Sequence, residues 1–171
     1  CWSWQNNMEK LDADIVIVAT GASGLIAALH VQSVKKVIML TKSDAENSDS
    51  FLAQGGICVL RDKNDFDSFM EDTMKAGHYE NRKESDEIMI NSSRDIINEL
   101  IGYGVDFATK DGELDNTREG AHSKPRILFH EDITGKEITS TLLDVVRKLE
   151  NVTIMEYVTM KDIIEKDNVC K

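Results

Sequence analysis

Near its N-terminus the chain reads Asp14-Ile15-Val16-Ile17-Val18-Ala19-Thr20-Gly21-Ala22-Ser23-Gly24-Leu25. The β-branched run at 14–18 is typical of a buried parallel strand. After the glycines the apolar residues change to helical spacing, and a second apolar run follows at 36–40. Two strands joined by a helix form a βαβ unit, whose right-handed crossover makes the strands parallel neighbours. The sequence therefore predicts an α/β fold built on a parallel sheet.

Hydrophobic periodicity predicts the other elements of the chain. A helix is expected from about Asp86 to Ile101, ended by Gly102 and Gly104. Its buried residues are expected to be Met89, Ile96, Ile97, Leu100 and Ile101. The remaining expectations are a strand or buried segment at 57–60, a helix capped by Asp65, a helix opened by a Thr134–Glu137 capping box, and strands at 152–157 and 160–164. Without repeats or proline-rich linkers, residues 11–171 are expected to form one continuous domain behind a tail at 1–10.

Charge and composition argue against several classes of partner. The chain carries 31 acidic and 20 basic side chains, and its formal charge of −11 repels nucleic acid and anionic lipid surfaces. The longest apolar stretch, 15–29, is too short and too interrupted to span a bilayer. Cys1, Cys58 and Cys170 are widely separated, so no metal site is expected, and a reducing cytoplasm suits them best.

The segment between the first strand and helix carries the first candidate binding site. Glycines at such a turn let the backbone approach a pyrophosphate at a helix N-terminus, although a plain strand-to-helix turn explains the same residues. Ala19 stands where the first glycine of this pattern is usual. If that position needs a positive φ, its methyl group costs about 1 kcal/mol or more.

The end of the second strand bears on which dinucleotide would bind. An acidic residue commonly holds the ribose hydroxyls there, but this chain has Thr41 and Lys42. Ordinary NAD binding therefore loses support. Lys42 is able to meet a phosphate, although a solvated loop cation is the commoner explanation of a single lysine.

Four blocks of sequence together resemble the succinate dehydrogenase/fumarate reductase flavoprotein family and, within it, the L-aspartate oxidases. The blocks are 16–25, 47–57 with its Ala53-Gln54-Gly55-Gly56, 119–128 with Glu119-Gly120-Ala121-His122-Ser123 and Arg126, and 132–135. They extend over nearly the whole chain from Leu11 onward, yet amount to about the first third of such an enzyme. The resemblance implies a Rossmann-like FAD-binding domain that is incomplete at its C-terminus.

The resemblance also implies the cofactor and the residues that hold it. Related enzymes carry a histidine, covalently bonded to the flavin, where this chain has Asp49. FAD is therefore expected to be bound non-covalently. Bare backbone at Gly55-Gly56 suits close approach of the flat isoalloxazine ring, whereas a simple flexible turn is the alternative. The residues implied to contact FAD are Thr20, Gly21, Ala22, Ser23, Gly24, Lys42, Asp49, Ser50, Phe51, Leu52, Ala53, Gln54, Gly55, Gly56 and Thr159.

Glu119 is the residue most informative about substrate. The relatives that act only on dicarboxylates lack an acid in this block, whereas a carboxylate would pair with the ammonium group of aspartate. The resemblance therefore implies that Glu119 orients the amino group over the flavin. A surface glutamate in a loop is the alternative interpretation.

The implied reaction is FAD-dependent oxidation of L-aspartate to iminoaspartate, with oxygen or fumarate accepting the electrons and quinolinate synthase as a possible partner. In the family the remaining catalytic groups, including a key arginine, come from beyond Lys171, so the 171 residues alone are expected to be inactive. Three alternatives remain open: a fumarate reductase or succinate dehydrogenase flavoprotein, a non-catalytic dinucleotide-binding fragment, and a nicotinamide-dependent dehydrogenase.

Overall fold

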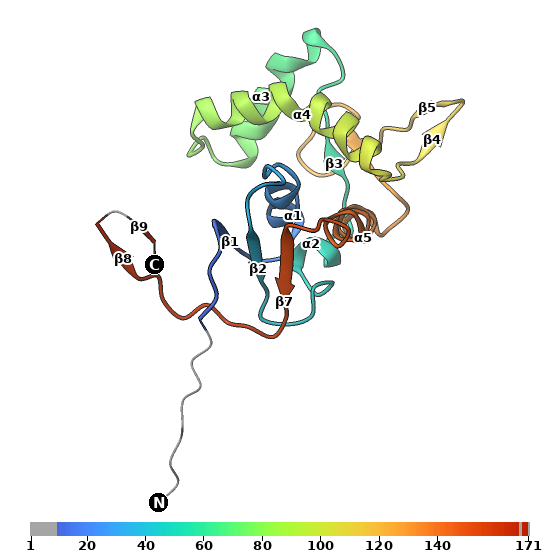
Figure 1. Ribbon diagram of the computed structural model, residues 1–171. Coiled ribbons are helices and arrows are strands. Elements are labelled where there is room, and N and C mark those ends of the chain that lie inside the picture. Colours follow the sequence, from blue (N-terminus) through green and yellow to red (C-terminus); the bar gives the residue numbers. More distant parts are fainter. Residues whose placement is uncertain (1–9, 168, 171) are drawn as a thin grey trace, which may run out of the picture.

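The computed structural model describes residues 10–167 and 169–170, so the expected tail at 1–10 lies outside it except for Lys10. Its centre is a parallel sheet of β1 (Ile15–Val18), β2 (Val37–Leu40) and β7 (Val152–Met155), with β2 in the middle (Figure 1). Ile15 pairs with Val37, and Val37 pairs with Val152. The predicted parallel α/β fold is confirmed.

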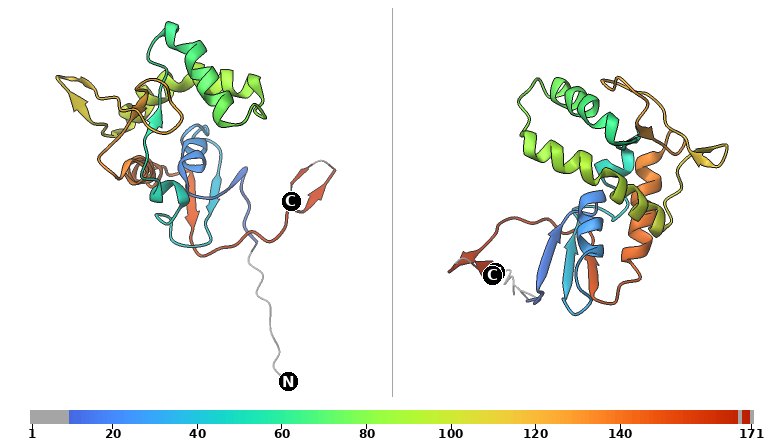
Figure 2. Two further views of the ribbon diagram at one scale, coloured as in Figure 1. Left: turned by 180° about the vertical axis from the view of Figure 1, so that it is seen from behind. Right: turned by 90° about the horizontal axis from the view of Figure 1, so that it is seen from above.

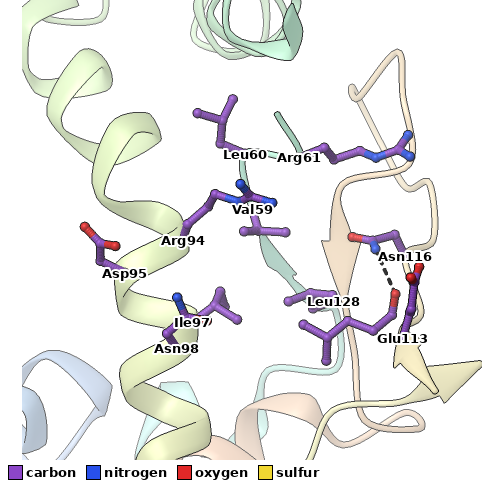
Figure 3. Close-up of a pocket in the computed structure, with 11 residues that line it drawn as sticks. Val59, Leu60, Arg61, Arg94, Asp95, Ile97, Asn98, Glu113, Asn116 and Leu128 are labelled. Carbon is purple, nitrogen blue, oxygen red and sulfur yellow. Dashed lines mark hydrogen bonds between the residues drawn. The ribbon is translucent and has the colours of Figure 1, made fainter. Parts of the chain in front are cut away.

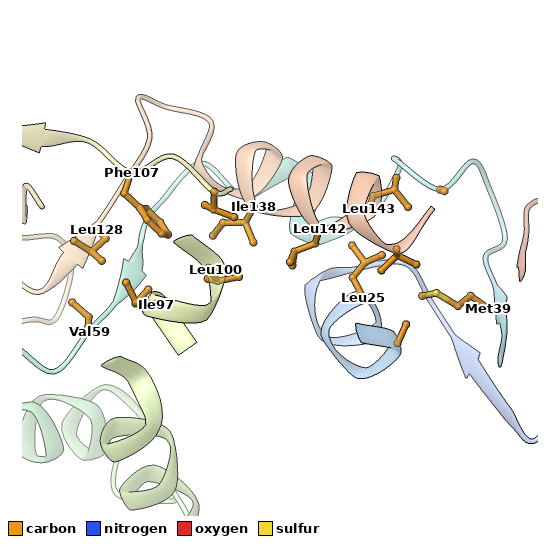
Figure 4. Packing of buried hydrophobic residues seen from close by; sticks show 14 of the residues in the cluster. Leu25, Met39, Val59, Ile97, Leu100, Phe107, Leu128, Ile138, Leu142 and Leu143 are labelled. Atoms are coloured by element: carbon orange, nitrogen blue, oxygen red, sulfur yellow. The ribbon is translucent and has the colours of Figure 1, made fainter. Parts of the chain in front are cut away.

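Two helices cover one face of this sheet. α1 (Ala22–Leu29) connects β1 to β2, and α5 (Thr134–Val146) precedes β7. Alternate strand residues such as Val37 and Met39 point into the core between sheet and helices. Figure 4 shows Leu25 and Leu142 meeting there. On the opposite face of β1, Val16 and Val18 are about half exposed.

A second layer lies beyond the sheet (Figures 1 and 2). It contains α3 (Phe66–Ala76), α4 (Lys83–Tyr103) and an antiparallel pair, β3 (Ile57–Cys58) with β6 (Ile127–Leu128). A hairpin of β4 (Thr109–Lys110) and β5 (Glu113–Leu114) projects from this layer. The short helix α2 (Asp49–Leu52) lies against α5 and connects the layers.

The expected helix caps are wrong in detail. Asp65 does stand at the N-cap of α3, but its carboxylate binds Arg126 instead of the helix N–H groups. The N-cap of α5 is Ile133, without a side-chain cap. Thr134 Oγ1 accepts from the His130 N–H, and Glu137 Oε1 accepts from the Asp106 N–H. For Asp65 and Glu137 a partner distant in the chain replaces the local hydrogen bond, whereas Thr134 bonds a residue only four positions earlier.

The expected limits of α4 and of the last strands are also wrong in part. Gly104, at φ +105°, ends α4, whereas Gly102 lies inside the helix. Met89 and Ile101 were expected to be buried, but they are 49% and 42% exposed. They flank a stripe in which Ile90, Ile97 and Leu100 are the buried residues.

Residues 160–164 form no strand, because this segment has no neighbouring strand in the described part of the chain. A small hairpin of β8 (Glu165–Lys166) and β9 (Val169–Cys170) follows it. Among the helices that the structure describes, none combines the length and apolar character required to cross a membrane.

Candidate functional site

A pocket of about 520 Å³ opens at the carboxyl ends of β1, β2 and β7. In open α/β sheets this edge is where ligands bind, because the loops that follow parallel strands converge there. Seven of the residues expected to contact FAD line the pocket: Thr20, Gly21, Ser23, Lys42, Asp49, Ser50 and Thr159. They come from four segments far apart in the chain, which the fold brings together.

The turn after β1 has a backbone geometry that lets a ligand approach the main chain closely. Ala19 adopts φ +126°, a conformation that favours glycine, so the strain expected at this position is present. A side chain on Gly24 would press against the backbone oxygen of Ala19. Thr20 is 3% exposed, and its Oγ1 has no hydrogen-bond partner among the described residues. A buried hydroxyl of this kind costs free energy unless a ligand satisfies it.

The second block is joined directly to this turn. Ser48 caps α2 by accepting a hydrogen bond from the Phe51 N–H, which places Ser50 next to α1. Ser50 Oγ accepts from the N–H of Ala22 at 3.2 Å. On its other side, α2 contacts the start of α5, where the Gly135 N–H donates to the Ala53 carbonyl oxygen. The first turns of α1 and α5 therefore fix α2 from both sides.

The residues that follow Ser50 lead away from the pocket. Phe51, Leu52, Ala53, Gln54, Gly55 and Gly56 are not part of its lining. Among the residues that the structure describes, a Cβ at Gly55 would meet one neighbour, Glu119 Oε2 at 3.7 Å. A Cβ at Gly56 would overlap Ile127 Cγ2 and the Leu128 backbone oxygen. Packing against β6 therefore already requires glycine at position 56, a reason that the sequence does not show.

The loop that carries Glu119 is tied to α3 by a buried charge cluster. Arg126 is fully buried and binds the carboxylates of Asp65 and Asp72. Burial alone would raise the pKa of Asp72, but hydrogen bonds from Ser123 and Arg126 outweigh it and lower this pKa from 3.8 to about 2. Sequence patterns predicted a helix-capping role for Asp65 and no role for Asp72, because nothing local marks these two acids as partners of a distant arginine.

Two further cavities lie away from the sheet-edge pocket. One, of about 590 Å³ between α4 and the β4–β5 hairpin, contains none of the expected site residues (Figure 3). The other, of about 540 Å³, lies between α3 and α4 and includes Gly56, Cys58 and His122. His122 thus faces an apolar cavity next to the glycine pair.

The model of the FAD binding domain family matches residues 14–171. The chain belongs to this family. Its FAD cofactor suits the pocket at the sheet edge, where the glycine turn exposes backbone and Thr20 Oγ1 lacks a partner among the described residues. The expectation of a Rossmann-like FAD-binding domain is confirmed.

Curated relatives of this FAD-binding domain are L-aspartate oxidases. The chain is 43% identical to the enzyme of Clostridium perfringens over 161 residues, which are 94% of this chain and 37% of that protein. The enzyme of Clostridium acetobutylicum is also 43% identical, again over 94% of this chain and 37% of the relative. The chain therefore spans little more than a third of the length of these relatives.

Two solved structures share the fold of this chain. Mycobacterium smegmatis Sdh1 superposes with a TM-score of 0.85 at 26% identity, over 95% of this chain and 30% of that chain. E. coli quinol fumarate reductase superposes with a TM-score of 0.88 at 23% identity, over 95% and 29% respectively. The resemblance to the succinate dehydrogenase/fumarate reductase flavoproteins and their L-aspartate oxidase members is confirmed.

Proposed function

We propose that the complete protein oxidises L-aspartate to iminoaspartate with FAD, and that this chain supplies the N-terminal part of its cofactor site. The observation that carries the proposal is the position of Glu119, whose carboxylate lies beside Gly55 at the end of the second cofactor block. A carboxylate at this point is suited to an ammonium group on the substrate. The L-aspartate oxidases that are 43% identical to the chain support the same reaction.

The residues of the sheet-edge pocket fit the nucleotide part of FAD. In this proposal the glycine turn and the start of α1, from Thr20 to Gly24, take the pyrophosphate, because the first N–H groups of a helix have no partner within it. Lys42 offers a positive charge at the same pocket, and Thr159, which follows β7 in the chain, also lines it. The bound flavin supplies the electron chemistry by accepting a hydride from the substrate. Asp49 cannot form a histidyl link, so the bound state is non-covalent.

The segment 51–56 and Glu119 belong to the flavin and substrate side of the proposed site. Leu52 and Gly55 are exposed, and in our proposal they face the ring system of the cofactor. The proposed reaction carries three further predictions. The electron acceptor is oxygen or fumarate, the partner is quinolinate synthase, and the location is cytoplasmic. We also predict that the 171 residues alone are inactive, because the chain spans 37% of the length of the L-aspartate oxidase of Clostridium perfringens.

Replacement of Glu119 in the protein expressed from its complete gene tests the substrate assignment. Glu119→Gln removes a charged hydrogen bond worth about 1.5–3 kcal/mol, so the KM for L-aspartate should rise about tenfold or more. The KM for fumarate reduction should not change, because fumarate has no ammonium group. Glu113→Gln, on the exposed β5 hairpin, is the control. An unchanged KM for L-aspartate in Glu119→Gln would contradict the assignment.

A fumarate reductase or succinate dehydrogenase flavoprotein is the second candidate, since Sdh1 of Mycobacterium smegmatis shares the fold at 26% identity. Comparing turnover of succinate and L-aspartate by the complete protein decides between them. A colourless complete protein that does not quench FAD fluorescence would favour the non-catalytic alternative. For the 171 residues by themselves, supplied with FAD and L-aspartate, we expect neither peroxide nor iminoaspartate.

A further inference from the structure

The guanidinium of Arg126 has five N–H groups, and each has a partner. Nε donates to Asp65 Oδ2 at 2.7 Å, and Nη2 donates to Asp65 Oδ1 at 3.0 Å and to Ser68 Oγ. Nη1 donates to Asp72 Oδ2 at 2.6 Å and contacts His122 Nδ1 at 3.2 Å. The group also stacks on the ring of Phe69, with 4.9 Å between Arg126 Cζ and the ring centroid. Only a planar fork with five donors satisfies this arrangement.

This geometry fixes the protonation pattern of His122. An arginine nitrogen only donates, so the Nδ1 atom that faces it must accept and cannot carry a proton. In the neutral ring the proton is then on Nε2, which lies 3.1 Å from Cys58 Sγ. Phe69 packs edge-to-face against the imidazole, with 5.5 Å between the ring centroids. The ring therefore has one orientation and one tautomer.

The charges around His122 favour the same neutral form. Burial and the charge of Arg126 lower the pKa of His122, and the carboxylates of Asp72 and Asp65 offset part of this effect. On the other side of the ring, burial raises the pKa of the Cys58 thiol. A neutral thiol offers no charge that would stabilise an imidazolium. Nε2–H is thus a fixed donor that faces Cys58 Sγ, in the cavity that Gly56 also lines.

The same cluster holds the backbone of the loop in place. Asp72 Oδ2 accepts hydrogen bonds from the N–H and the Oγ of Ser123, at 2.8 and 2.7 Å. The N–H of His122 donates to the backbone oxygen of Glu119, which turns the loop back on itself. Glu119 itself is exposed and, among the residues that the structure describes, has no ion-pair partner. Its position beside Gly55 therefore depends on the anchor formed by its neighbours.

We propose that Arg126 and Asp72 are positioning residues for the flavin-facing loop: they fix His122 as the neutral tautomer protonated on Nε2 and hold Glu119 beside Gly55. The part concerning Glu119 rests on the proposed function. The part concerning His122 does not. Neither Arg126 nor Asp72 touches the substrate in this proposal, and both act through the loop.

Nitrogen NMR of the complete, FAD-loaded protein tests the tautomer directly. With ¹⁵N-labelled histidine and a His122→Gln sample for assignment, the wild-type spectrum at neutral pH should show His122 with a bare Nδ1 and a protonated Nε2. A proton on Nδ1, or an imidazolium, overturns the proposal. This measurement needs no turnover and no folded variant of Arg126, so its outcome is independent of the proposed reaction.

A double-mutant cycle tests the control of Glu119. Asp72→Asn should raise the KM for L-aspartate severalfold with little change in kcat, leave the KM for fumarate unchanged, and have no further effect in a Glu119→Gln background. Glu71→Gln is the matched control, because Glu71 precedes Asp72 on α3 and binds only the exposed Tyr79 hydroxyl. Equal effects of Asp72→Asn with and without Glu119 would overturn the positioning role. If the wild-type protein does not turn over L-aspartate at all, that result would instead contradict the proposed function.

Discussion

Ser50 Oγ accepts a hydrogen bond from the backbone N–H of Ala22, 28 residues earlier in the chain, at 3.2 Å. A Cβ on Gly21 would lie only 3.0 Å from the same oxygen. The glycine turn and the serine of the second cofactor block therefore form one structural unit. Their contact explains why the pocket at the sheet edge has walls from both segments.

Ser50→Ala should weaken FAD binding by the complete protein. Removing the hydroxyl leaves the Ala22 N–H without its acceptor and separates the two blocks, at a cost of about 1 kcal/mol, or roughly fivefold in Kd. Titration of flavin fluorescence measures the change. Ser92→Ala, whose hydroxyl on α4 binds only backbone of its own helix, should leave the Kd unchanged. Equal affinities of the two variants would disprove the role of Ser50.

Ala19→Gly should make the protein more stable. The alanine adopts φ +126°, so glycine relieves strain of about 1 kcal/mol. Ala27→Gly provides the opposite control, because Ala27 is an exposed residue inside α1 and glycine there should cost about 1 kcal/mol. Urea denaturation of the two variants measures both changes. A loss of stability in Ala19→Gly would show that the methyl group makes a compensating contact.

The two consecutive glycines should respond differently to alanine. Gly56→Ala forces a methyl group into Ile127 and the backbone of β6, and overpacking of this kind costs about 1–3 kcal/mol or more. Gly55→Ala has open space apart from Glu119 Oε2 and should fold normally. If the flavin lies against Gly55, this variant should show weaker FAD binding with an unchanged melting temperature. Thermal unfolding and a fluorescence titration separate the two effects, and equal melting temperatures would contradict the packing role of Gly56.

The Asp72 cluster should make the protein sensitive to acid. The pKa of Asp72 is about 2 in the folded state against 3.8 as its ordinary value, so its carboxylate stabilises the fold fully above pH 3.8. This contribution, roughly 2 kcal/mol, should disappear as the pH falls from about 4 to 2. Urea denaturation across this range measures it. Asp72→Asn should be less stable near neutral pH and lose less stability in acid, and parallel acid profiles for the two proteins would contradict the role of Asp72.

The parallel sheet, the glycine turn and the membership of the flavoprotein family could all be predicted from the order of residues alone. These features are recorded locally: a β-branched run marks β1, a change of period marks α1, and the Ala-Gln-Gly-Gly block marks the second cofactor segment. Even the strain at Ala19 was predictable, because it follows from one missing glycine in a known turn geometry.

The pairing of side chains that are distant in sequence could be seen only in the folded molecule. Asp65 and Glu137 look like helix-capping residues locally, but the fold supplies Arg126 and the Asp106 N–H as partners for them. Gly56 looks like a cofactor contact, but β6 already leaves no room for a side chain there. Helix and strand patterns are set by neighbours in the chain, whereas buried polar groups and close contacts depend on which segments the fold brings together.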